Sequence, residues 1–82
     1  MSEEAYQGLL DALRGRLAVV ADREFYQRDP GGHLNALMAA SEKVENAADL
    51  LPEPVDPHLR HYLQRQSFTK AVAWLEERQA GL

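Results

Sequence analysis

The chain has 82 residues, which is the size of one small domain near the lower limit at which a single apolar core suffices. It has no cysteine, and this excludes disulfides, thiolate nucleophiles and thiolate zinc sites. Thirteen acidic and nine basic side chains give a formal charge of −4, which argues against binding to a phosphate backbone.

The beginning of the chain, Met-Ser-Glu-Glu, is acidic and lacks the basic and apolar regions of a signal peptide. No apolar run approaches the roughly 18 to 20 residues that are needed to span a bilayer. We therefore expect a cytoplasmic protein that binds neither membrane nor nucleic acid.

The first predicted helix covers about residues 3–28, a stretch without proline. Ser2 is a plausible cap, and Glu3 and Glu4 suit the positive end of the helix dipole. Apolar residues recur at helical spacing and predict the inward face: Tyr6, Leu9, Leu10, Leu13, Leu17, Val20 and Ala21.

A second, narrower stripe on this helix consists mostly of small residues. It contains Gly8, Ala12, Gly15 and Val19, and Tyr26 follows one heptad later. Glycine inside a helix costs about 0.5 to 1 kcal/mol relative to alanine. One interpretation is that these glycines lie on an exposed surface where the protein tolerates this cost. The other is close approach by a further helix, from this chain or from a second copy.

Two carboxylates are candidates for polar contacts within the core. On a helix that continues to residue 28, Glu24 lies on the apolar face, where the start of the next helix and His33 would satisfy it. We interpret it as a structural group rather than a catalytic acid. Glu45 is interpreted in the same way, with Arg14 or Arg16 as its expected partner.

The second predicted helix covers residues 30–51. Asp29 is placed to cap it, Pro30 suits the first helical position, and Pro52 prevents its continuation. Its inward stripe is predicted to contain Leu34, Leu37, Met38, Ser41, Val44, Ala48 and Leu51.

Three prolines in residues 51–57 predict a stiff connector, followed by short helices over residues 57–65 and 68–79. The apolar stripe changes phase near Gln66 and Ser67, so the helix is expected to break there, with Ser67 as the next cap. Trp74 lies off the stripe. It either covers the edge of the core or belongs to an exposed binding patch.

Tyr62, Phe68, Ala71 and Leu75 stand at the spacing of the aromatic, aromatic, small and large apolar positions of a tetratricopeptide helical pair. The stretch from Tyr62 to Leu75 therefore resembles one such pair. The resemblance implies a tight helix–turn–helix, and it does not extend to the peptide-binding groove of repeat arrays, because there is no second copy of the motif.

Only the histidines suggest a chemical function. His58 and His61 are three residues apart on one predicted helix and could share a metal with His33 or a carboxylate. His33 is also a candidate for phosphotransfer, by analogy with small helical histidine-phosphotransfer domains. His33 is predicted in the first turn of its helix, whereas the histidine of those domains lies midway along a helix. No phosphate loop or catalytic triad is found, so we expect no enzyme activity and no cofactor.

We therefore predict one all-α domain over residues 1–82, an antiparallel hairpin of two long helices with two short C-terminal helices in a small bundle. The hairpin has more apolar surface than two short helices can cover, so we expect a homodimer, with a possible four-helix core. The predicted function is a non-catalytic, bacterial-type interaction or regulatory module with an unidentified protein partner. The small-residue stripe, Tyr26 and Trp74 are its candidate contacts, and the alternative is a histidine-centred site.

Overall fold

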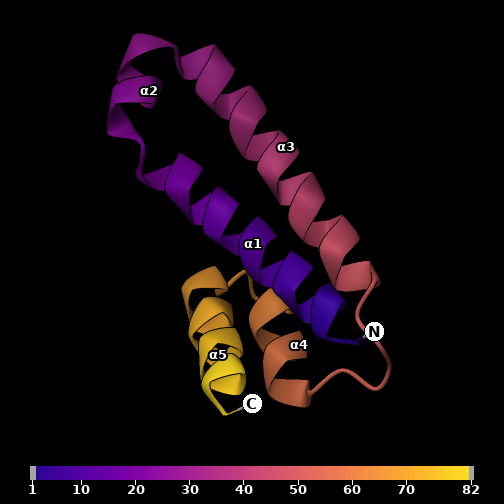
Figure 1. Cartoon of the computed structure of the whole chain (residues 1–82). Coiled ribbons are helices and arrows are strands. Elements are labelled where there is room, and N and C mark those ends of the chain that lie inside the picture. Colours follow the sequence, from indigo (N-terminus) through magenta and orange to yellow (C-terminus); the bar gives the residue numbers. More distant parts are fainter. Residues whose placement is uncertain (1, 82) are drawn as a thin grey trace.

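The computed structural model describes residues 2–81, which form an all-α fold, as predicted (Figure 1). Two long antiparallel helices, α1 (Ser2–Ala21) and α3 (Pro30–Asp49), form a hairpin, and α2 (Arg23–Arg28) lies at its closed end. Two shorter helices, α4 (Pro57–Gln64) and α5 (Phe68–Ala80), pack beside the open end. The predicted hairpin with two short C-terminal helices is confirmed.

The first helix does not continue to residue 28, so that part of the prediction is wrong. It ends at Ala21, and Asp22 caps the separate helix α2 by accepting a hydrogen bond from the Phe25 amide at 3.1 Å. A short acidic side chain can bond to nearby amides outside a helix, and it therefore favours a cap over a helix interior. At the other end, α1 begins at Ser2, whose side chain lies outside the described part of the chain.

The predicted start of the second long helix is confirmed. Asp29 accepts a hydrogen bond from the Gly32 amide at 3.0 Å, and Pro30 is the first helical residue. This helix, α3, ends at Asp49 rather than at Leu51, although Leu51 is still buried.

The break between the two short helices lies at the predicted place. Gln66 has a left-handed backbone with φ of 57°, and the Ser67 amide donates to the Tyr62 carbonyl at 2.8 Å. Ser67 occupies the cap position of α5, but its side chain makes no capping hydrogen bond. At the start of α4 the cap does form, because Asp56 accepts from the His58 amide at 2.8 Å.

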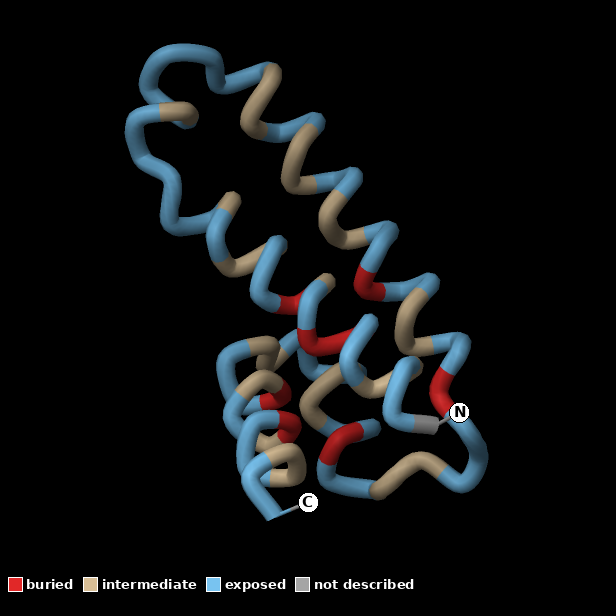
Figure 2. Tube along the Cα trace, viewed as in Figure 1, coloured by how far each residue is buried: buried red, intermediate tan, exposed pale blue. Residues whose placement is uncertain are grey.

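The buried core occupies only the half of the hairpin that lies near α4 and α5 (Figure 2). On α1 the last buried residue is Leu13, and on α3 the first is Val44. None of the residues of α2 is buried. The core cluster consists of Leu9, Leu10, Leu13, Val44, Leu51, Leu59, Ala71 and Leu75.

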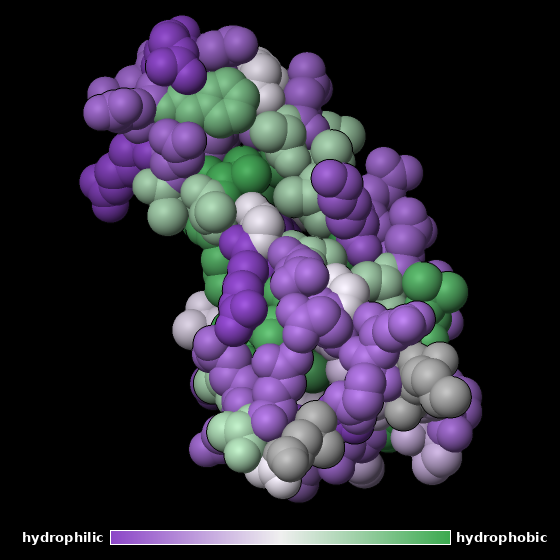
Figure 3. Space-filling model, in the orientation of Figure 1, coloured by the Kyte–Doolittle hydropathy of each residue, from purple (hydrophilic) through white to green (hydrophobic). Residues whose placement is uncertain are grey.

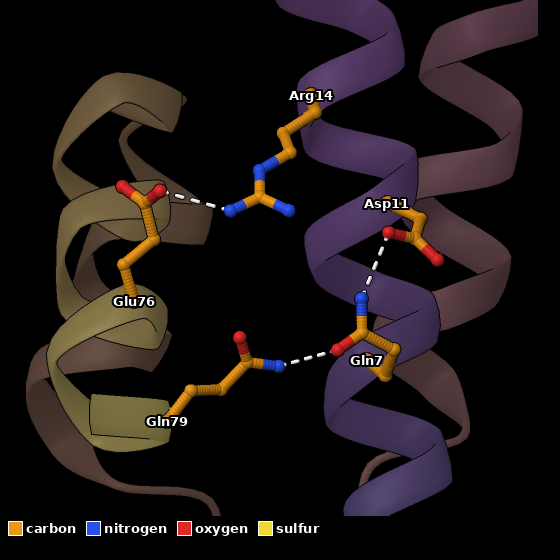
Figure 4. Close-up of polar contacts among 5 residues, drawn as sticks. All are labelled: Gln7, Asp11, Arg14, Glu76 and Gln79. Atoms are coloured by element: carbon orange, nitrogen blue, oxygen red, sulfur yellow. Dashed lines mark hydrogen bonds and ion pairs between the residues drawn. The ribbon is translucent and has the colours of Figure 1, made fainter. Parts of the chain in front are cut away.

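Polar contacts attach α5 to α1 (Figure 4). Arg14 donates to Glu76 at 2.8 Å, and the Gln79 amide donates to Gln7, which itself donates to Asp11 at 2.9 Å. Near the chain ends, the Arg78 guanidinium forms a bidentate ion pair with Glu3, and its central carbon lies 3.8 Å from the ring centroid of Tyr6. These contacts hold α5 along the first turns of α1.

The Glu3–Arg78 pair makes stability depend on pH. The hydrogen bond from Arg78 lowers the pKa of Glu3 below its ordinary value of 4.5. The unfolded chain therefore binds this proton more readily, so the stabilisation is present above pH 4.5 and is lost as the pH falls through the folded pKa. We expect Arg78→Ala to flatten the fall of the urea midpoint between about pH 5 and about pH 3.

Arg14→Ala is the matched control, because Arg14 makes a single hydrogen bond to Glu76. The Arg14 side chain is 48% exposed, against 24% for Arg78. Exposed single pairs contribute little. At neutral pH, Arg78→Ala is expected to destabilise more than Arg14→Ala, since it also removes the contact with the Tyr6 ring. Equal effects of the two substitutions would contradict this ranking.

Candidate interaction surface

The half of the hairpin farthest from α4 and α5 exposes large apolar side chains. We define this distal half as residues 17–21, α2 and residues 30–41. Val20, Tyr26, Leu34 and Met38 are between 51% and 62% exposed. In Figure 3 apolar colour gathers over α2 and the neighbouring turns of α1 and α3. The predicted excess of apolar surface on the hairpin is therefore located in its distal half.

The two long helices of the distal half also carry no Asp, Glu, Lys or Arg on any face. Residues 17–21 and 30–41 contain none of them. The charged residues resume at the tip, in α2 and its caps, and on α3 with Glu42 and Lys43. A helix that lacks charge all round is typical of a buried position, and interface cores are depleted of charged residues.

His33 connects the three segments at the tip. Its Nε2 lies 2.7 Å from the Val19 carbonyl at the end of α1. A carbonyl oxygen only accepts, so Nε2 donates its proton in this contact. The Phe25 and Tyr26 rings each lie nearly perpendicular to the imidazole, at centroid distances of 5.5 and 5.4 Å. The predicted phosphotransfer candidate therefore has one ring nitrogen engaged in holding the tip together.

The small-residue stripe of α1 lies beside α3. A shallow groove of about 350 Å³ is lined by Ala12, Gly15 and Val19 from α1 and by alanines of α3. A Cβ atom added at Gly8 or Gly15 would meet nothing within 4 Å. Close approach by another helix of this chain is therefore absent in the described residues, and approach by a second copy stays a prediction. Tyr26 is separated from the stripe by the break at Asp22.

Open space at these two glycines leads to a stability prediction. Gly15→Ala should raise the free energy of unfolding by about 0.5 to 1 kcal/mol, because alanine has the higher helix propensity and nothing obstructs its methyl group. Gly8→Ala should behave alike and the two effects should add. Urea unfolding at a protein concentration low enough to keep the chain monomeric would measure them. Destabilisation by either methyl group would show that something covers the stripe.

Trp74 is half-buried and packs against the core cluster. Of the two interpretations offered by the sequence, this position agrees with a residue at the edge of the core. A role of Trp74 in binding a partner stays a prediction.

The two carboxylates lie elsewhere than predicted. Glu24 is exposed in the first turn of α2, away from the core, because the helix breaks at Asp22. At the start of α3 the Gly32 amide donates to Asp29 instead of to Glu24. The His33 ring contacts the Val19 carbonyl. For Glu45 no ion pair with Arg14 or Arg16 forms within residues 2–81, since those arginines contact Glu76 and Ser41.

A cavity of about 360 Å³ that the sequence did not indicate lies between α3 and the turn joining α4 to α5. Arg16 lines it, with Nε donating to the Ser41 hydroxyl at 3.1 Å and the guanidinium carbon 4.6 Å from the Phe68 ring centroid. Glu45 also lines this cavity. A stripe pattern cannot reveal it, because it depends on how α5 is placed against the hairpin.

The other histidines are at the opposite end of the molecule from His33. His58 is 77% exposed, and its Nδ1 lies 3.3 Å from Asp56, the cap of its own helix. His61 is exposed and lies beside the Tyr62 ring. Within residues 2–81 no three side chains among His, Asp and Glu are grouped closely enough to hold a metal ion.

Comparison of the chain with protein-family models, with curated proteins and with solved structures finds no match. None of the helices described here combines the length and the apolar character required to cross a membrane. The interaction surface is therefore argued from the chain's own residues.

Proposed function

We propose that this chain is a small non-catalytic interaction or regulatory module of bacterial type that acts through protein–protein contact in the cytoplasm. One observation carries the proposal: the distal half of the hairpin exposes Val20, Leu34 and Met38 on helices without charged residues. Clustered apolar exposure of this kind marks interaction sites. Tyr26, on α2, is exposed in the same half, whereas the exposed Leu50 lies apart at the end of α3.

The surrounding structure supports a contact surface that is already formed. The hydrogen bond of His33 to Val19 and the contacts of its ring with Phe25 and Tyr26 hold the tip in one arrangement. A surface that is ordered before binding loses less conformational entropy when its partner arrives. The rest of the fold, which we call the proximal half, contains the buried core and the ion pairs of α5 and serves as the scaffold.

An affinity capture experiment tests this function. The tagged chain and the double variant Leu34→Glu/Met38→Glu are each incubated with lysate of the source cells. The matched control is Asn46→Glu/Thr69→Glu, which adds the same two charges at exposed positions outside the distal half. We expect the wild type and the control to retain a common protein that the distal variant loses. Retention of the same proteins by all three would contradict the proposed surface.

A further inference from the structure

The cavity between α3 and the turn joining α4 to α5 contains charged groups that the proposed function does not use. We infer that this cavity binds a basic α-amino acid of the lysine type, at a site separate from the distal half. Its volume of about 360 Å³ falls within the range of small-molecule sites, about 300 to 1,000 Å³. Such sites combine an apolar lining with a few convergent polar groups, and this cavity has both.

Arg16 is fixed in this cavity and still has hydrogen-bond donors for a ligand. Its Nε donates to the Ser41 hydroxyl at 3.1 Å, and the guanidinium carbon lies 4.6 Å from the Phe68 ring centroid. These two contacts set the plane of the guanidinium. Its Nη groups have no hydrogen-bond acceptor within residues 2–81. Two parallel N–H donors of a guanidinium match the two oxygens of a carboxylate, so Arg16 is oriented to bind an acid group.

Two carboxylates on α3 line the same cavity. Glu45 and Asp49 are four residues apart, and neither forms an ion pair within the part of the chain that the structure describes. Both follow Ser41 at steps of four residues, which places the three on one side of the helix. At a rise of about 1.5 Å per residue, Glu45 lies about 6 Å and Asp49 about 12 Å beyond Ser41 along the axis.

A basic amino acid has its charges in the same order. Its carboxylate pairs with Arg16, and its α-ammonium, which is attached to the same carbon, reaches Glu45. The side-chain ammonium lies about 6 Å further along an extended stem, which is the axial separation of Glu45 and Asp49. The aliphatic stem then packs on Ala48 and Leu63, which line the cavity between these groups.

The sum of charges distinguishes this ligand from simpler ones. One arginine and two acids give the lining a charge of −1, and lysine carries +1 at neutral pH. The complex is therefore neutral. A neutral amino acid would leave Asp49 without a partner, and a diamine would leave Arg16 without one. Charged groups that lose water without a partner weaken binding.

Titration of the isotope-labelled chain with L-lysine, at constant pH and ionic strength, tests the site by NMR of the backbone amides. We expect saturable shifts in residues 41–49 and 63–68, with a dissociation constant below about 1 mM. Norleucine lacks the side-chain cation, cadaverine lacks the carboxylate, and D-lysine cannot place all three charged groups at once. Each should bind at least about fivefold more weakly. Equal affinity for the two enantiomers, or no saturable shift in this range, would overturn the inference.

Three variants assign the contacts. Arg16→Gln and Glu45→Gln should each raise the dissociation constant for L-lysine at least about tenfold. Arg16→Gln should not weaken the binding of cadaverine, which has no carboxylate. The matched control is Glu42→Gln, which removes the same charge from an exposed position on α3 outside the cavity.

The control should keep the affinity for L-lysine within about twofold of the wild type, because an exposed charge outside the site is screened. Circular dichroism should show the same helical content in all three variants. If Glu42→Gln weakens binding as much as Glu45→Gln does, the attraction comes from the overall negative charge of the chain, and the site is refuted.

Discussion

Leu13→Ala is expected to lower the free energy of unfolding by about 2 to 5 kcal/mol, the usual cost of removing a leucine side chain from a packed core. Leu13 is fully buried and belongs to the core cluster with Leu10 and Leu75. A domain of this size is stable by only about 4 to 12 kcal/mol in total. The substitution should therefore leave a marginally stable or partly unfolded chain, measured as a lower urea midpoint.

Leu34→Ala is the matched control for the same chemical change. Leu34 is 56% exposed in the distal half, so its replacement should change the free energy of unfolding by no more than about 0.5 kcal/mol in the monomer. Both proteins should be unfolded at the lowest workable concentration, where association does not contribute. Equal losses for the two variants would mean that the distal half is buried within the monomer, contrary to the structure.

This contrast also shows which part of the fold the sequence could predict. Helical spacing placed Leu34 and Met38 on the same inward stripe as Val44 and Leu51. Leu34, Met38 and Val44 do lie along α3, and Leu51 follows its end. Periodicity gives the direction of a side chain but not whether another element covers it. That depends on where α4 and α5 pack, and they reach only the proximal half.

The break at Asp22 illustrates a second limit. In a helix interior an aspartate on the solvent face is unremarkable, so nothing in the apolar pattern indicated that this one caps a new helix. The signal available was local: Asp22 stands three residues before the Phe25 amide that it accepts. Once the helix breaks there, Glu24 leaves the apolar face, and its predicted structural role disappears.

The candidate surface was only partly predictable for a different reason. The sequence directed attention to the small residues Gly8 and Gly15, because glycine in a helix is costly. The neutral run over residues 30–41 was equally visible but became meaningful only when Leu34 and Met38 were found exposed. A lack of charge is ambiguous in sequence, since it fits a buried helix as well as an interface.

Asp29→Ala is the second substitution with a large expected effect. Asp29 accepts the Gly32 amide at 3.0 Å, and its backbone carbonyl accepts the first hydrogen bond of α3, from the His33 amide at 2.9 Å. Alanine keeps the second contact but loses the first, and removal of such a cap costs about 0.5 to 2 kcal/mol. Because His33 lies in this first turn, its contact with Val19 should loosen as well, so the tip should respond as a unit.

Two variants make the test specific. Asp29→Asn keeps an oxygen that can accept the Gly32 amide, so it should retain most of the stability. Asp49→Ala removes an acid from the last turn of the same helix, where a negative charge is unfavourable, and should be neutral or slightly stabilising. Hydrogen exchange should show faster exchange at Gly32 and His33 in Asp29→Ala alone. If that variant exchanges as slowly there as the wild type, the tip is held by the aromatic contacts around His33 and not by the cap.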